Sequence, residues 1–293
     1  MKRARFWPLA LIGPLLLASA GCGLLAHLAD SASKMAAGAP SPSAAERSLS
    51  APSSAPPAPV SKTSTVSASP SPVFPRVVRE AMAAVASQTR VPLEAPAWTG
   101  LSGLSATTRG QATAYSVSLF KCSVPLPVNN PQVGTGQWCG AMANVYGQFG
   151  GETIGTQTAP AVLQSLTGAF AVSSLPSGVT HQSVSLGNGI TGEQYAGQAG
   201  AQFVQWQEGD WTLQVQGGSN PQAVAQQVVA LLTQYRLPPR PGMLVAVVAP
   251  DGIHTVVAWE AASGQVVYST GGYHNPASAI AMAAAMAAYS GGS

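Results

Sequence analysis

Apolar and polar residues alternate most regularly in the second half of the chain, at residues 202–207 and 211–216. The segment Glu208-Gly209-Asp210 between them has the composition of a tight turn, so the pattern predicts a β-hairpin. In its second strand the apolar and polar side chains point to opposite faces: Trp211, Leu213 and Val215 against Thr212, Gln214 and Gln216. One buried and one wet face are typical of an antiparallel sheet.

A helical pattern follows this hairpin. Asn220 is suited to cap a helix and Pro221 to occupy its first position. The apolar residues then recur at helical spacing and form a single stripe: Val224, Val228, Leu231, Leu232 and Tyr235. The pattern therefore predicts an amphipathic helix that ends near Tyr235.

The same layout returns about fifty residues later. Strands are expected at 243–249, 253–260 and 265–270, and Asn275-Pro276 opens a helix that carries Ile280, Ala283, Met286 and Ala287 and ends near Tyr289. With a strand at 190–195, residues 190–235 and 243–289 both have the order β-β-β-α. The predicted fold class is therefore α+β, an antiparallel sheet covered by helices, with a doubled C-terminal β-β-β-α unit. Ancient duplication and independent use of the same capping rules both explain the doubling.

The first half of this region has weaker patterns. A helix is expected to begin at Phe74-Pro75 and to end before Val91, because Val78, Ala81, Met82 and Val85 have helical spacing. Residues 93–112 are expected to be irregular, with Trp98 folded onto the core. Strands are expected at 113–122 and 139–149, and a short helix at 160–167 with Gly168 as its C-terminal cap.

Residues 183–187 and 190–195 are predicted strands, joined at Gly187-Asn188-Gly189. The join also matches Gly-x-Gly-x-x-Gly, the pattern of a dinucleotide-binding turn. That turn must lead into a helix. Because the residues after it have the pattern of a strand, a hairpin is the favoured interpretation.

The chain contains three cysteines, and two of them flank the long connection at 123–137. Cys122 and Cys139 are expected to form a disulfide, since neither a Cys-x-x-Cys motif nor a nearby histidine suggests a metal or thiol site. Closing a loop of this size stabilises a protein by about 3 kcal/mol in the chain-entropy model.

The third cysteine follows a secretory signal. Lys2, Arg3 and Arg5 precede an uncharged apolar run over residues 6–20. The sequence Ser19-Ala20-Gly21-Cys22 resembles the lipobox of bacterial lipoproteins. The resemblance implies that residues 1–21 are a signal peptide and that Cys22 is acylated, becomes the new N-terminus and anchors the protein to the extracytoplasmic face of the membrane. Ordinary cleavage after Ala18-Ser19-Ala20 and an uncleaved anchor are the two alternatives.

Composition divides the rest of the chain into a tether and a globular part. Residues 22–73 are expected to be disordered after the lipidated cysteine, because their Ser, Ala and Pro residues cannot bury enough apolar surface to fold. Residues 74–293 are expected to form a single α+β ectodomain. Only 8% of all residues are charged and the net charge is +3, which excludes a basic nucleic-acid-binding face.

Candidate ligand-binding residues come from two places. Trp206 and Trp259 occupy corresponding strand ends and line an apolar binding surface if they are exposed; burial in the core is the favoured alternative. Tyr273 and His274 lie in the Gly-rich approach to the Asn275 helix cap, where a helix N-terminus attracts anions. A tight strand-to-helix turn explains the same residues.

The sequence contains no Gly-x-Ser-x-Gly or His-Glu-x-x-His motif, so no catalytic residue, metal site or cofactor is predicted. The expected function is non-catalytic: binding, sensing or envelope support, with an envelope protein or an apolar ligand as partner and the membrane bound through Cys22. The alternative is a secreted hydrolase that acts on cell-wall or sugar polymers.

Overall fold

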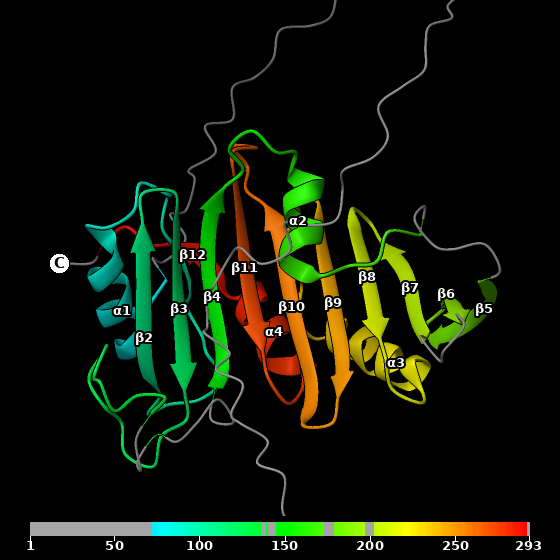
Figure 1. Ribbon diagram of the computed structural model, residues 1–293, viewed down its shortest axis with the longest axis horizontal. Coiled ribbons are helices and arrows are strands. Elements are labelled where there is room, and N and C mark those ends of the chain that lie inside the picture. The colour runs from blue at the N-terminus through cyan, green and yellow to red at the C-terminus, as the bar shows by residue number, and fades with distance from the viewer. Residues whose placement is uncertain (1–71, 136–138, 140–144, 173–178, 197–201, 292–293) are drawn as a thin grey trace, which may run out of the picture. The chain divides into compact units, whose positions relative to one another are not determined.

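The computed structural model describes residues 72–135, 139, 145–172, 179–196 and 202–291. The expected signal peptide, Cys22 and nearly all of the expected tether therefore lie outside the described residues. The described part of the chain is organised around one large sheet (Figure 1).

Ten strands form this sheet, in the order β2-β3-β4-β11-β10-β9-β8-β7-β6-β5. The strands are β2 (Ser105–Gln111), β3 (Ala114–Phe120), β4 (Val145–Thr153), β5 (Thr180–Gly187), β6 (Ile190–Ala196), β7 (Gln202–Glu208), β8 (Trp211–Gln216), β9 (Gly242–Ala249), β10 (Gly252–Glu260) and β11 (Val266–Gly272). Neighbouring strands are antiparallel except for β8 and β9, which are parallel. The mixed α+β class and the mostly antiparallel sheet are thus confirmed.

Helices cover both faces of the sheet. The helices are α1 (Arg76–Ala86), α2 (Ala159–Thr167), α3 (Pro221–Leu232) and α4 (Pro276–Ala284). Figure 1 shows α2 in front of β9 and β10, with α1, α3 and α4 behind the sheet. The main core lies between the sheet and the rear helices, and it includes Val78, Met82, Leu213, Val257 and Ile280. A smaller core, with Leu163 and Val267, lies beneath α2.

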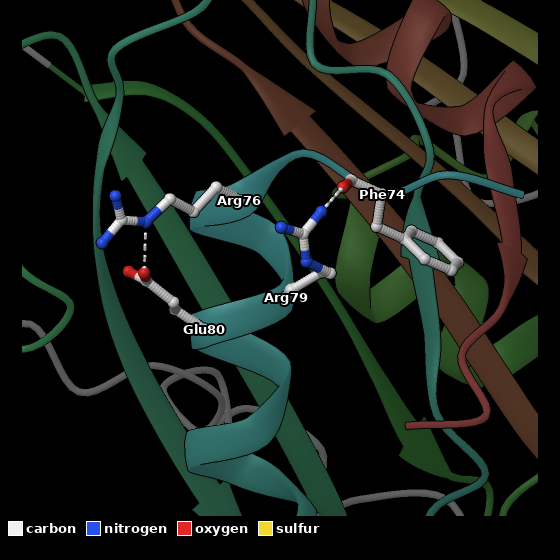
Figure 2. Close-up of polar contacts among 4 residues, drawn as sticks. All are labelled: Phe74, Arg76, Arg79 and Glu80. Atoms are coloured by element: carbon white, nitrogen blue, oxygen red, sulfur yellow. Dashed lines mark hydrogen bonds and ion pairs between the residues drawn. The ribbon is translucent and has the colours of Figure 1, made fainter. Parts of the chain in front are cut away.

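Helix α1 begins without a side-chain cap, and its first turn is held by arginines instead. The Arg79 guanidinium donates to the Phe74 carbonyl over 2.6 Å, and Arg76 Nε lies 2.6 Å from Glu80 Oε1 (Figure 2). The predicted apolar positions, Val78, Ala81, Met82 and Val85, are all buried, which confirms this helix and its orientation.

Local turn and cap signals were also predicted correctly. The β5–β6 hairpin turns at Asn188 and Gly189, both with positive φ, as a type I′ turn requires. Gly168 ends α2 in the left-handed conformation, and the Asn220 side chain accepts from the Ala223 amide at the start of α3. The GxGxxG match is therefore a hairpin.

Several predictions from the sequence were wrong. Residues 93–112 are not irregular: they contain β2 and the short strand β1 (Glu94–Pro96). Helix α4 ends at Ala284, and Met286 and Ala287 belong to β12 (Met286–Ala288), which pairs with β1. Helix α3 likewise ends at Leu232 rather than Tyr235. The short β1–β12 pairing forms between segments almost 200 residues apart and has no periodicity of its own.

Trp98 is not folded onto the core. Its side chain is 48% exposed, and its ring stacks on Tyr235 with 6.3 Å between centroids. The prediction that one face of β8 is exposed to solvent is also wrong in part, because Gln214 and Gln216 are buried. The segment that follows α2 crosses this face and covers both glutamines (Figure 1).

The β2 edge of the sheet is partly covered by a neighbouring segment. Asn129 donates its backbone amide to the Ala106 carbonyl over 2.9 Å, and its side-chain oxygen accepts from the Thr108 amide over 2.7 Å. Asn129 thus occupies main-chain positions to which a further strand would bind.

The Cys122–Cys139 disulfide is present and packs against Phe120, Val133 and Val145. It joins the end of the β3 segment to the connection that precedes β4. No helix in the described part of the chain is long and apolar enough to span a membrane.

Candidate functional site

A half-open cleft of about 400 Å³ lies beside β8 on the face of the rear helices. Its walls are the β7–β8 turn, the start of β8 and the segment that follows α3. The residues that line it are Glu208, Gly209, Asp210, Trp211, Leu213, Leu232, Tyr235, Arg236, Leu237, Pro238, Pro239 and Arg240. We call this the Trp211 cleft.

Turn chemistry and proline content shape the Trp211 cleft. Gly209 has a φ of 57°, which allows the tight connection between β7 and β8. After α3, Pro238, Pro239 and Pro241 prevent a further helical turn and keep the returning segment irregular. The Trp211 indole fixes this segment, because its Nε1 group donates to the Pro238 carbonyl over 3.1 Å.

Close backbone contact also positions Trp211. A Cβ atom at Gly242 would lie 2.5 Å from the Trp211 ring and 2.8 Å from the Ala258 carbonyl oxygen. Glycine at 242 therefore lets the indole approach the β9 backbone closely. The resulting wall is rigid, since Trp211 is 7% exposed and its one polar group is paired.

The Trp211 cleft has an apolar interior and a charged rim. Leu213 and Trp211 are buried, and Leu232 and Leu237 are half-buried, whereas Asp210, Arg236 and Arg240 are exposed. The Glu208 carboxylate is fixed by the buried Trp206 indole, which donates to its Oε1 over 2.8 Å. Such a site suits a ligand with an apolar body and a polar end. No Ser, Cys or His is among the described residues that line the cleft.

A second group of polar residues surrounds the β9–β10 turn. His254 Nε2 lies 3.1 Å from Asp251 Oδ1, but the two groups are not aligned as a hydrogen bond. His274 Nδ1 lies 3.1 Å from the Asp251 carbonyl oxygen. The rings of His254 and Tyr273 meet edge to face at 5.3 Å, and burial raises the pKa of the Tyr273 phenol.

Tyr273 and His274 thus lie close to Asp251 and His254. The sequence did not predict this proximity. His274 has a φ of 75° and turns the chain towards α4, whose cap Asn275 accepts from the Ala277 amide over 3.0 Å. A strand-to-helix turn accounts for these contacts. The described residues contain no group of three His, Cys, Asp or Glu side chains that could hold a metal ion.

Trp206 and Trp259 lie in the main core and are each 3% exposed. The favoured prediction of core burial is confirmed, and the two rings offer no exposed binding surface. Trp206 is connected to the Trp211 cleft by its hydrogen bond to Glu208 and by its cross-strand pairing with Leu213. Cys22 lies outside the described residues.

No pattern in the sequence predicted the Trp211 cleft. Trp211 and Leu213 have the alternation of ordinary core residues, and Tyr235 has the spacing of a helix stripe. The one available signal was the proline run after α3, which marks an irregular segment without saying where it lies.

Comparison of the chain with protein-family models, with curated proteins and with solved structures gives no match in any of the three.

Proposed function

We propose that this protein is an extracytoplasmic, lipid-anchored lipoprotein with a non-catalytic binding role, and that its ligand occupies the Trp211 cleft. Residues 1–21 are the signal peptide, Cys22 carries the lipid, and residues 22–73 tether the ectodomain of residues 74–293 to the membrane. The lipobox-like sequence and a disulfide suited to an oxidising compartment support this arrangement.

The observation that carries the binding role is the combination of volume and wall chemistry in the Trp211 cleft. A volume of about 400 Å³ falls within the range of small-molecule sites. Apolar walls favour the body of an amphipathic ligand, and the guanidinium groups of Arg236 and Arg240 at the rim favour a polar or anionic end. An envelope lipid or a similar amphiphile has this chemistry.

We propose further that residues 190–235 and 243–289 are two copies of one β-β-β-α unit. The order β6-β7-β8-α3 followed by β9-β10-β11-α4 supports this, as do the Asn-Pro starts of both helices. In each unit the helix packs against the last strand of that unit.

The anchor is tested by the intact mass of the mature protein from bacterial membranes, with and without reductant and alkylation. The expected mass begins at Cys22 with a diacylglyceryl group, and a Cys22→Ala variant is expected to lose it. A lipid-free protein that begins at Gly21, or one that retains residues 1–21, would disprove lipidation.

The binding role is tested with the fluorescent amphiphile 8-anilino-1-naphthalenesulfonate, which has an apolar body and an anionic end. A Leu237→Asp variant places a charge on the apolar wall and is expected to weaken probe binding about tenfold. Val124→Asp, at an exposed position outside the cleft, is the matched control. Equal affinity of wild type and Leu237→Asp would place probe binding elsewhere.

A further inference from the structure

We infer that the protein has a second binding site, on the face of the sheet covered by α2, and that it takes a neutral saccharide. The site is a groove of about 310 Å³ between α2, the segment that follows α2, and strands β7, β8 and β9. We call it the Phe170 groove. Its walls include Gln164, Phe170, Gln205, Thr212 and Met243.

Phe170 is an exposed aromatic residue held on a fixed backbone. Its ring is 49% exposed, and the residue lies in the segment after α2, which has no regular secondary structure. The Gln214 side chain pairs with its backbone on both sides: Oε1 accepts from the Phe170 amide over 2.8 Å, and Nε2 donates to the Phe170 carbonyl over 3.1 Å. Gln216 Nε2 adds a bond of 2.9 Å to the Gly168 carbonyl.

Burying two glutamine amides is unfavourable unless their hydrogen bonds are made, and here they are made to the segment that carries Phe170. The two side-chain amides therefore form hydrogen bonds with the backbone of this segment, as a neighbouring strand would, and hold the segment against the sheet. A pre-positioned aromatic ring loses little conformational entropy when a ligand binds to it. This arrangement fits a binding platform better than an unused surface residue.

A row of stacked rings supports Phe170 from behind. Its centroid lies 5.5 Å from that of Phe203, which stacks on Tyr195 at 4.6 Å, and Tyr195 stacks on His181 at 5.6 Å. The last three residues are direct cross-strand neighbours on β7, β6 and β5. Phe203, at the end of this row, packs against one side of the Phe170 ring, and the exposed part of the ring faces solvent.

The chemistry of the Phe170 groove selects an uncharged ligand with many hydroxyl groups. None of the described residues that line it is charged, so an ionic ligand would lose hydration without gaining a counter-charge. Gln164, Gln205 and Thr212 provide amide and hydroxyl groups that both donate and accept. Gln205 Oε1 accepts from Gln214 over 2.9 Å, and its Nε2 has no hydrogen-bond partner among the described residues.

Gln164 Nε2 donates to the Ala169 carbonyl over 3.2 Å, so the Gln205 amino group is the donor left for a ligand. A purely apolar ligand fits the Phe170 groove less well, because it would cover this amino group without pairing it. A pyranose ring matches both features: its hydroxyl groups can pair with the amides and its C–H face can lie on Phe170. The site is separate from the Trp211 cleft, since alternate residues of β8 serve opposite faces. Trp211 and Leu213 line the cleft, and Thr212 lines the groove.

The test is calorimetric titration of the full ectodomain with chitotetraose and maltotetraose, which are neutral, and with tetragalacturonate, which is anionic. Wild type is expected to bind at least one neutral tetrasaccharide with a dissociation constant of about 1 mM or lower, a typical value for a shallow site. Phe170→Ala and Gln205→Ala are expected to weaken this binding about tenfold.

Trp98→Ala is the matched control for Phe170, because its ring is equally exposed and lies outside the groove. Gln234→Ala, an exposed glutamine after α3, is the control for Gln205. Both controls are expected to bind like wild type, and circular dichroism checks that all four variants fold. The inference is overturned if neither neutral sugar binds, if tetragalacturonate binds equally well, or if Phe170→Ala leaves the affinity unchanged. Leu237→Asp leaves sugar binding intact even if the Trp211 cleft has no ligand, so the two sites are tested separately.

Discussion

The side chain of Gln214 pairs with both backbone polar groups of Phe170, as a neighbouring strand would. The glutamine is 1% exposed and lies on β8, 44 residues further along the chain. Its amide also donates to Gln205 and accepts from Gln216. One buried amide therefore joins the segment after α2 to two strands of the sheet.

Replacing Gln214 by Leu should detach this segment. The variant leaves the Phe170 amide and carbonyl without partners, so the free energy of unfolding is expected to fall by about 1–3 kcal/mol. Hydrogen exchange at residues 168–171 should accelerate more than exchange in β10. Gln207→Leu, at an exposed position on β7, is the control. Unchanged exchange at 168–171 would show that other contacts hold the segment.

Loss of the disulfide should lower stability without altering the sheet. The Cys122→Ser/Cys139→Ser double variant closes no loop in the unfolded chain, and the expected cost is about 3 kcal/mol in urea denaturation. The bridge lies outside both proposed sites, so binding of the amphiphile and of the neutral sugars should persist. A double variant as stable as the oxidised wild type would contradict the expected contribution.

Gly242→Ala should disturb the Trp211 cleft and the core together. The new methyl group would lie 2.5 Å from the Trp211 ring and 2.8 Å from the Ala258 carbonyl oxygen, so the ring or the strand must shift. A stability loss of about 1–3 kcal/mol is expected, with a shift in tryptophan fluorescence and weaker amphiphile binding. At Gly271 the three atoms nearest to such a methyl group all belong to the flexible side chain of Gln148. Gly271→Ala should therefore cost less, and the reverse order would argue against this account.

The carboxyl group of Glu94 should make the free energy of unfolding depend on pH. Burial raises the pKa of its carboxyl group, so the folded protein keeps this proton where the unfolded chain releases it. The free energy of unfolding therefore falls as pH rises from about 4.3 through the folded pKa. Glu94→Gln should be more stable than wild type at neutral pH, and the difference should vanish below about pH 4. Parallel urea curves for the two proteins across this range would contradict the assignment.

Local signals in the sequence predicted much of this fold. The β5–β6 turn, the Asn220 and Asn275 caps and the stripe of α1 each depend on a few adjacent residues, and each is confirmed. The disulfide was predicted from the spacing of the two cysteines and from the lack of a Cys-x-x-Cys motif or a nearby histidine. These features share a short range of interaction, which a single sequence records directly.

The errors have a common physical cause as well. Gln214 has the alternation of a solvent-facing residue, and it is buried only because a segment 44 residues away crosses over it. Met286 continues a helical pattern, yet it pairs with Pro96. The Trp211 cleft and the Phe170 groove both form where distant segments meet, so their residues have no shared local pattern.

The partly covered β2 edge limits how copies of this protein can associate. Growth of a fibril by strand addition needs an acceptor edge at each end of every subunit. Asn129 occupies part of that acceptor on the β2 side, so a further strand can pair along β2 only after Asn129 moves away. This geometry disfavours polymerisation through the β2 edge.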